Sequence, residues 1–260
     1  MKTKSIASPE VSIIMPAFNA ERYIDESISS VINQTFNKWE LIIVNDNSTD
    51  GTQEIINRNK NDKRIISITN TNCLGAAKSR NKAINISQGT YIAFLDSDDI
   101  WDEHKLEIQL KFMNENNIKF SFSSYRVIDE KGLIIGHRHA PTFQRYNDRL
   151  RHNKIGCLTS IFKRDCLSRE DLFMPEIKMR QDYALWLKIL KEVKIAHGLD
   201  ACLASYRTHP SSLSANKIRA ILYTLQVYRK IENLNLILSL YYFLNNVSIN
   251  IFLKIKNKFF

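Results

Sequence analysis

Three aspartates lie within four residues near the middle of the chain, in the segment Asp96-Ser97-Asp98-Asp99. Carboxylates this close together repel one another, so they need either full solvation or a positive partner. Mg²⁺ and Mn²⁺ are suitable partners, because such ions take one or two protein carboxylates and fill their other positions with phosphate oxygens and water. Residues two apart in extended backbone point the same way, which directs Asp96 and Asp98 toward one cation. The alternative is a solvated turn in which Asp98 or Asp99 caps the next helix.

A buried strand is predicted directly before this acidic segment. Residues 91–95 (Tyr-Ile-Ala-Phe-Leu) form a continuous apolar run, typical of a strand that is covered on both faces. In open α/β sheets, ligands bind just beyond the carboxyl ends of the strands. The position of the aspartates therefore favours a binding site over a plain turn.

The segments around this strand indicate how the rest of the sheet is built. Apolar runs predict further strands at residues 11–15, 39–45 and 64–69. Helices are predicted over 21–33, after the polar loop 46–52 (where Asp50 or Thr52 can cap), over 75–86 and over 103–114. This alternation is typical of an α/β domain with a mostly parallel sheet wrapped by helices.

The second half of the chain has a different pattern. We expect a strand over 120–128 with a hairpin partner at 132–139, and a charged segment, 145–154, before the apolar run 155–162. An amphipathic helix over 181–190, a short strand over 202–206 and a polar loop over 207–214 follow. No internal repeat is present in the sequence.

Composition limits the class of protein. The 260 residues are 44% apolar and 25% charged, as in globular proteins, and the net charge of +10 points to a polyanionic partner: nucleic acid, an anionic membrane surface or a phosphorylated substrate. The four cysteines show no C-x-x-C spacing, which argues against a zinc site or a disulfide framework and favours reduced thiols. The N-terminus lacks the apolar core of a signal peptide, so we expect a cytoplasmic protein.

The C-terminal segment 216–260 is predicted to form a helical tail that is both basic and apolar. It contains seven Lys or Arg residues against one Glu, and residues 233–253 carry no charge at all. That length could span a bilayer, but five asparagines and two serines lie in this stretch and make spanning costly. The tail could pack on the protein, or it could lie on an anionic membrane with Lys254, Lys256 and Lys258 among the headgroups. We favour membrane attachment.

Several motifs in order make the sequence resemble one family. They are V-S-I-I-M-P-A-F-N (11–19), V-N-D-N-S-T-D-G-T (44–52), G-A-A-K-S-R-N-K-A (75–83), F-L-D-S-D-D (94–99) and R-Q-D-Y-A-L-W-L (180–187). This set resembles the family 2 inverting glycosyltransferases, which have the Rossmann-like glycosyltransferase-A (GT-A) fold and use nucleotide-sugar donors. The later segments I-G-C-L-T (155–159) and S-Y-R-T-H-P-S-S-L-S (205–214) are similar to bacterial enzymes that build O-antigen, capsule or teichuronic acid. The resemblance implies a catalytic domain over 1–215.

The resemblance also implies roles for particular residues. Asp182 stands where the family places its general base, and Asp98 where it places the main metal ligand, with His209 as a second candidate ligand. Donor binding is implied for Pro16, Ala17, Asn19, Asp46, Arg80, Asp96 and Ser97. The family often has Glu before the base, whereas this chain has Gln181, so that carboxylate partner is absent. Each residue also has a structural alternative, such as a turn for Asp46, an ion pair for Arg80 and a helix N-cap for Asp182.

The implied reaction moves glucose or another hexose from a UDP-sugar to a lipid-diphosphate-linked saccharide, with Mn²⁺ or Mg²⁺ and with inversion at the anomeric carbon. Such an enzyme would work on the inner face of the cell membrane. Two other classes are weighed against it. A phosphotransfer enzyme of the haloacid dehalogenase type also has D-x-D after a strand, but its nucleophile usually lies near the N-terminus, whereas Asp98 is in mid-chain. A nucleic-acid-binding protein would explain the positive charge, but the acidic loops would repel phosphates.

Overall fold

The computed structural model describes residues 8–210 and 217–259, without the side chains of residues 217–219 and 250–259. Its strands are β1 (Val11–Ala17), β2 (Trp39–Asn45), β3 (Ile65–Thr69), β4 (Tyr91–Phe94), β5 (Ile100–Trp101), β6 (Phe120–Ile128), β7 (Ile134–Arg138), β8 (Phe143–Arg145), β9 (Ile161–Lys163) and β10 (Ile195–Arg207). Its α-helices are α1 (Ile24–Ile32), α2 (Thr52–Asn59), α3 (Ala76–Ile86), α4 (Lys105–Glu115), α5 (Tyr146–Arg151), α6 (Gln181–Val193), α7 (Lys217–Gln226) and α8 (Leu236–Phe259).

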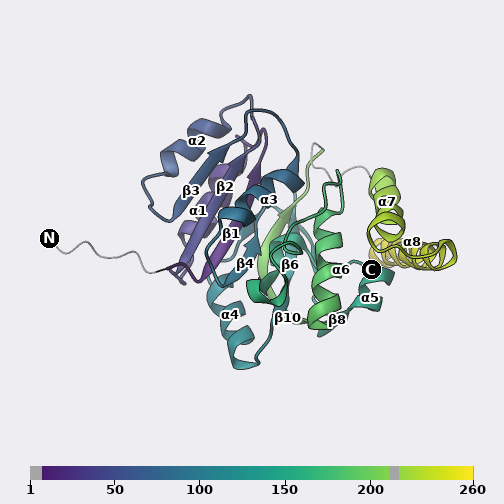
Figure 1. Ribbon diagram of the computed structural model, residues 1–260. Helices are drawn as coiled ribbons and strands as arrows, with labels where there is room; N and C mark the ends of the chain where they lie inside the picture. The colour runs from purple at the N-terminus through teal and green to yellow at the C-terminus, as the bar shows by residue number, and fades with distance from the viewer. Residues whose placement is uncertain (1–7, 211–216, 260) are drawn as a thin grey trace.

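The strands form one mixed sheet in the spatial order β3-β2-β1-β4-β9-β6-β10-β5, with β7 beside β6 and β8 beside β10 (Figure 1). The first four neighbours, β3 to β4, are mutually parallel, and β9 joins them to β6 through antiparallel pairs. The four predicted parallel strands and the mixed character of the sheet are confirmed. Mostly apolar sequences mark β1, β2 and β4 because these strands are buried on both faces, whereas the edge strand β3 is only partly buried.

Helices cover the two faces of the sheet unequally. One face packs against α1, α2 and α4 through side chains such as Ile28, Ile56 and Leu110. The other face packs against α3 and α6, where Trp186 of α6 lies among Phe94, Phe120 and Phe162. The sheet is thus the middle layer of a three-layer α/β fold, and its strand ends emerge between the helix layers.

Three segments differ from the sequence prediction in extent. Strand β1 continues two residues further than expected, since Pro16 and Ala17 pair with Val44 and Asn45 of β2. The predicted strand 202–206 is the end of the thirteen-residue strand β10. Most of the earlier β10 side chains are only partly buried, so they lack the apolar alternation that marks a strand in a sequence. The apolar run 155–162 contains a 3₁₀ turn, Cys157–Thr159, before β9.

The C-terminal helices pack beside α5 and α6 at one end of the molecule (Figure 1). A π-helical turn, Val227–Ile231, connects α7 to the segment before α8 and contributes Val227 and Tyr228 to a small core. Leu150 of α5 and Tyr183, Ala184 and Leu187 of α6 complete that core. Within residues 8–210 and 217–259, no helix combines the length and hydropathy needed to cross a membrane.

Candidate active site

The loops that carry the predicted site residues meet at one edge of the sheet. Strand β1 lies between β2 and β4, and all three strands run in the same direction. Their carboxyl ends therefore bring the loops after Ala17, Asn45 and Phe94 together. This is where open α/β folds bind ligands.

Asp46, the first residue after β2, is buried, and its carboxylate holds the loop of residues 70–75 in place. Its Oδ1 accepts hydrogen bonds from Asn70 Nδ2 (2.7 Å) and the Leu74 N–H (2.9 Å). Its Oδ2 accepts from the Gly75 N–H (2.7 Å) and, at 3.4 Å, from the Cys73 thiol. Burial alone would raise the pKa of Asp46, but these hydrogen bonds offset it and the pKa is lowered. Asp46 is therefore held as a carboxylate that organises its neighbourhood.

The loop after β1 is tied to the loop after β2. The Asn19 N–H donates to Ser48 Oγ (3.0 Å), and Asn19 Oδ1 accepts from the Thr49 N–H (2.9 Å). Asn19 has φ = 47°, a left-handed conformation that asparagine tolerates better than most residues. The Ala17 carbonyl accepts from the Asp46 N–H (2.8 Å). These bonds fix the two loops relative to each other before any ligand binds.

Arg80 of α3 is 6% exposed and forms an ion pair with Asp96 through Nη2 and Oδ1. Burial opposes the charge of Arg80, but the carboxylates of Asp96 and Asp182 more than compensate, so the pKa of the guanidinium is raised. The Arg80 Nε atom is also buried, and no atom of the described residues accepts a hydrogen bond from it. Arg80 therefore does form the ion pair that was its structural alternative to donor binding, and this ion pair lies inside the candidate site.

The acidic loop after β4 brings Asp98 to a residue far away in the sequence. Asp98 Oδ2 lies 2.8 Å from His209 Nε2, and the His209 ring packs on Tyr23 with 5.2 Å between ring centroids. Asp99 is 1% exposed, and its Oδ1 accepts from the Arg207 N–H (2.9 Å). Burial, and then the charges of the neighbouring aspartates, raise the pKa of both Asp98 and Asp99. The loop therefore favours a positive partner, as its sequence indicates.

The sequence pattern does not indicate the importance of Arg207. The polar pattern of residues 207–214 predicts that Arg207 begins a loop. In the structure Arg207 is instead the last residue of β10, and it is only 2% exposed. Its Nε donates to the Asp98 carbonyl (3.0 Å), its Nη2 pairs with Glu26 of α1, and its guanidinium lies over the Tyr23 ring. Arg207 thus holds the backbone of the acidic loop. A basic residue directly after an apolar strand was the available signal.

Asp182 lies in the first turn of α6. The residue preceding this helix is Arg180, with φ = 68°, so the interpretation of Asp182 as the N-cap is wrong. No described residue donates a hydrogen bond to the Asp182 carboxylate, so its lone pairs are free. Gln181 instead turns inward and donates to the Lys178 carbonyl (3.0 Å).

The buried Cys157 thiol lies within electrostatic reach of both Asp182 and the loop after β4. Burial first, and then the negative charge of Asp96, raise the pKa of the Cys157 thiol; Asp182 adds to the effect, whereas Arg80 opposes it. Strand β4, helix α3, the turn at 157–159 and helix α6 therefore converge on one charged region. The structure brings together Asp46, Arg80, Asp96, Asp98, Asp182 and His209 around the same edge of the sheet.

A family model matches this chain. The model described as "Glycosyl transferase family 2" covers residues 12–168, which is more than half of the sequence. The chain belongs to glycosyl transferase family 2. It is therefore a glycosyltransferase, as the motifs indicated, and the haloacid dehalogenase and nucleic-acid alternatives lose their support.

Two curated members of the family are similar over most of their length. The putative teichuronic acid biosynthesis glycosyltransferase TuaG of Bacillus subtilis is 44% identical over 87% of this chain and 90% of its own. The Escherichia coli enzyme WfgD, described as a UDP-Glc:alpha-D-GlcNAc-diphosphoundecaprenol beta-1,3-glucosyltransferase, is 40% identical over 93% of both chains.

Solved structures show that the glycosyltransferase has the GT-A fold. S. aureus TarS in complex with UDP-GlcNAc aligns with a TM-score of 0.70 at 21% identity, over 85% of this chain and 67% of that one. The mannosyltransferase PcManGT from Pyrobaculum calidifontis, in complex with GDP-Man and Mn²⁺, aligns with a TM-score of 0.67 at 20% identity, over 88% of this chain and 65% of that one. At these identities the likeness concerns the fold.

The glycosyltransferase offers two side chains to a divalent cation. Asp98 and His209 face each other, whereas Asp96 turns toward Arg80, and no group of three His, Cys, Asp or Glu side chains among the described residues converges on one point. A carboxylate oxygen and an imidazole nitrogen are suitable ligands for Mn²⁺. Because Mg²⁺ and Mn²⁺ take most of their other ligands from phosphates and water, two protein ligands fit the chemistry. Ser97, between the two aspartates in the sequence, is buried, and its side chain forms no hydrogen bond with the described residues.

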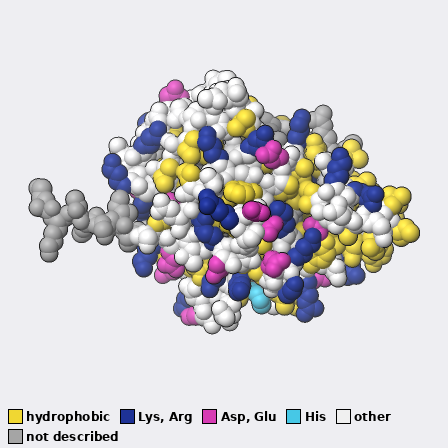
Figure 2. All heavy atoms as spheres, in the orientation of Figure 1, with side chains coloured by type: hydrophobic (Ala, Val, Ile, Leu, Met, Phe, Trp, Pro, Cys, Tyr) yellow, Lys and Arg dark blue, Asp and Glu magenta, His cyan; other side chains and the backbone are white. Residues whose placement is uncertain are grey.

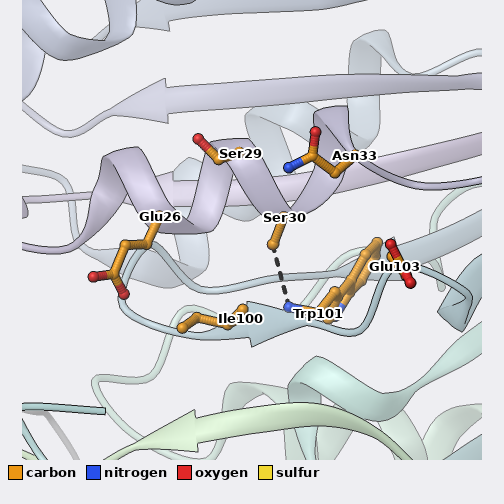
Figure 3. A pocket seen from close by; sticks show the side chains of 7 residues that line it. All are labelled: Glu26, Ser29, Ser30, Asn33, Ile100, Trp101 and Glu103. Atoms are coloured by element: carbon orange, nitrogen blue, oxygen red, sulfur yellow. Dashed lines mark hydrogen bonds between the residues drawn. The ribbon is translucent and has the colours of Figure 1, made fainter.

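A shallow groove lies beside this site, between α1 and β5 (Figure 3). It is lined by Glu26, Ser29, Ser30, Asn33, Ile100, Trp101 and Glu103, and the Trp101 N–H donates to Ser30 Oγ (3.2 Å). None of the predicted donor-binding residues lines it. Glu26, which pairs with Arg207, connects the groove to the acidic loop of the glycosyltransferase.

Proposed function

We propose that this protein is an inverting, metal-dependent glycosyltransferase that moves a hexose from a UDP-sugar to a saccharide linked to a lipid diphosphate. The similarity to WfgD supports this substrate class, because that enzyme is described as using UDP-Glc and a diphosphoundecaprenol-linked GlcNAc, and the alignment covers nearly all of both chains. The similarity to TuaG supports a role in a bacterial surface polysaccharide.

The observation that carries the proposal is a carboxylate without a hydrogen-bond donor among the described residues, beside the charged loops proposed to bind the donor. Asp182 accepts no hydrogen bond from the described residues, yet its charge interacts with Arg80 and Cys157 at the edge of the donor loops. A general base needs a free lone pair and a position next to the reacting atoms. Asp182 meets the first condition, and the convergence of α3, α6 and the acidic loop supports the second.

In the proposed reaction, the acceptor hydroxyl gives its proton to Asp182 while its oxygen attacks the anomeric carbon of the donor. A bond forms between that oxygen and the anomeric carbon, and the bond from the carbon to the nucleoside diphosphate breaks on the opposite face. The configuration at the anomeric carbon is therefore inverted, so an α-linked UDP-sugar yields a β-linked product.

The donor would be held by the loops at the ends of β1, β2 and β4. The backbone at Pro16 and Ala17, with Asn19 and Asp46, would contact the base; Arg80, Asp96 and Ser97 would contact the ribose or sugar. Asp98 and His209 would hold Mn²⁺ or Mg²⁺, which when bound neutralises the charge that grows on the leaving diphosphate. Arg207 keeps the backbone of the acidic loop in place for this task.

A lipid-linked acceptor also determines where in the cell the enzyme would act. Its lipid is anchored in a bilayer, so the enzyme would have to approach the inner face of the cell membrane. The net charge of +10 supports attraction to anionic lipids. We therefore propose peripheral attachment there.

The substitution Asp182→Asn tests this proposal, because it preserves shape while it removes the proton acceptor. We expect the affinity for UDP-sugar to stay within about threefold and the turnover to fall by about 10²–10⁴-fold. Glu192→Gln, an exposed carboxylate on the same helix, is the control and should leave both unchanged. Calorimetry of UDP-glucose binding without acceptor, and transfer from labelled UDP-glucose to a lipid-diphosphate GlcNAc acceptor, give the two readouts. Unchanged turnover in the Asn variant would contradict the role of Asp182.

A further inference from the structure

Helix α8 presents apolar side chains to solvent as well as to the protein. Its buried side includes Ser239 (0% exposed) and Asn246 (8% exposed). Its outer side instead presents aliphatic side chains to solvent. The exposed fractions are 60% for Leu236, 79% for Ile237, 43% for Leu240 and 63% for Leu244. A surface helix normally buries its apolar stripe and exposes its polar one.

Most of the exposed apolar side chains of α8 form one row; the exception is Leu238, which is 43% exposed and lies outside it. Leu236, Ile237, Leu240, Tyr241 and Leu244 follow the helical spacing i, i+1, i+4, i+5 and i+8, so they lie on a single side of α8. We call these five residues the α8 row. Figure 2 shows hydrophobic side chains gathered over the α7–α8 end of the molecule, which lies on the right in that view, with Lys and Arg side chains close to them.

The opposite side of α8 is already occupied. Tyr242 and Phe243 pack against the small core formed with α5, α6 and the π-helical turn. Ser239 Oγ donates to the Asn235 carbonyl (2.8 Å) and so has a partner inside the helix. The helix is thus docked on the catalytic domain by one side, and its orientation leaves the α8 row outward.

The charges near the α8 row distinguish between possible occupants. Arg229 and Lys230, just before α8, and Arg151 at the end of the adjoining α5 are all exposed. Of the acidic residues in this region, Glu232 is buried and paired with Lys191, and Asp148 of α5 is half-buried and accepts a hydrogen bond from the Arg145 N–H. A second copy of the chain that met this surface around a two-fold axis would bring equal positive charges together. An anionic bilayer instead accepts the aliphatic row among its acyl chains and the cations among its headgroups.

We infer that the α8 row is a membrane-docking surface, through which the folded protein lies on an anionic bilayer without crossing it. This inference rests on the proposed function in one respect, since a lipid-linked acceptor gives the docking its purpose. It deepens that proposal by naming the face that meets the membrane. In this inference α8 binds the membrane without rearranging, and its inner side stays packed against α5 and α6.

The test compares two triple variants in vesicle flotation. Leu236→Gln, Ile237→Gln and Leu244→Gln remove three side chains of the row that are each at least 60% exposed. Leu133→Gln, Ile134→Gln and Ile135→Gln in and next to β7 remove three side chains of nearly equal exposure (63%, 57% and 60%) elsewhere on the surface. Vesicles of phosphatidylcholine with phosphatidylglycerol are the probe, and pure phosphatidylcholine vesicles measure the electrostatic part.

We expect the parent to bind the anionic vesicles, the α8 triple to partition about a hundredfold more weakly, and the β7 triple to stay within about threefold of the parent. Ile237→Trp should bind more strongly, with a blue shift of its fluorescence on vesicles, because indole favours the bilayer interface. A gain of this kind cannot result from loss of folding. UDP-sugar hydrolysis should be unchanged in all of these variants, since none of them touches the donor site.

Each contrary result has a definite meaning. Absence of vesicle binding by the parent, or equal losses in both triples, would overturn the assignment. A parent dimer that the α8 triple converts to monomer, without a difference on vesicles, would identify a second copy as the occupant and overturn it as well. Flotation that depends on the α8 row in a protein without any UDP-sugar turnover would leave the docking surface standing and remove the proposed function.

Discussion

Lys105, the first residue of α4, leads to a prediction of how much the free energy of unfolding changes with pH. Its side chain is fully buried in the first turn of α4, where Nζ donates to Gln109 Oε1 (2.6 Å) and the Thr159 carbonyl (3.3 Å) and lies 5.1 Å from the centre of the Trp101 ring. No carboxylate of the described residues forms an ion pair with it. Burial therefore lowers the pKa of Lys105 from 10.5 to about 7.

The direction of the pH effect follows from proton binding. Between pH 7 and pH 10.5 the unfolded chain keeps a proton on this amine and the folded protein releases it, so stability rises with pH across that window and falls as pH returns to 7. The slope from this one group is about 1.4 kcal/mol per pH unit, and the whole window amounts to about 5 kcal/mol.

The variant Lys105→Met keeps the volume of the side chain and removes its charge. At pH 7 it avoids about 4 kcal/mol of the proton penalty, but it leaves Gln109 Oε1 without a donor, which costs about 1–3 kcal/mol. We therefore expect it to be more stable than the parent at pH 7 by about 2 kcal/mol, with a difference that shrinks and then reverses as pH rises toward 10.

Urea unfolding at pH 7, 8 and 9, followed by tryptophan fluorescence, gives the change of unfolding free energy with pH for the parent and for Lys105→Met. Other groups that titrate in this range are common to both proteins, so the difference between the curves isolates Lys105. Lys111→Met, on the same helix but 71% exposed, is the control and should run parallel to the parent. A Lys105→Met curve parallel to the parent would mean that the folded protein keeps the proton, and the reasoning would be refuted.

Two further predictions concern the sheet and the acidic loop. Gly89→Ala should lower the free energy of unfolding by about 3 kcal/mol or more, because its Cβ would lie 2.5 Å from the Ser12 backbone nitrogen. Gly136→Ala, whose Cβ would meet nothing closer than 4.0 Å, should be tolerated in the same thermal melts, and equal effects would contradict the steric argument. Removal of divalent cations by EDTA should abolish transfer and Mn²⁺ should restore it, whereas Asp98→Ala should remain inactive in Mn²⁺ and bind UDP-sugar about tenfold or more weakly. Full transfer in EDTA would rule out the metal.

Local sequence patterns predict those parts of the structure that local chemistry decides. The strand at 91–95 is a continuous apolar run and the strand at 39–45 is apolar apart from Glu40 and Asn45, and both are completely buried between helix layers. The acidic segment ends its strand because adjacent carboxylates cannot be buried in a sheet. Since parallel strands end at one edge, the loops of Asp46 and Asp96 meet there.

Contacts between distant segments were beyond such patterns. His209 lies next to Asp98 although 111 residues separate them along the chain, and Arg207 reaches Glu26 across 181 residues. No spacing rule predicts such pairs, because they depend on where β10 lies in the sheet. The position of Asp182 relative to Arg80 depends in the same way on how α6 packs against the sheet.

The C-terminal tail shows the division most clearly. Its sequence alone determined a helix that is basic, rich in aliphatic residues and interrupted by polar ones, with two possible uses. Helical periodicity sorts those residues onto sides of the helix, but it does not say which side a neighbour covers. Only the tertiary structure decided that Tyr242, Phe243 and Ser239 turn inward, because the surface offered by α5 and α6 accepts them and leaves the α8 row exposed.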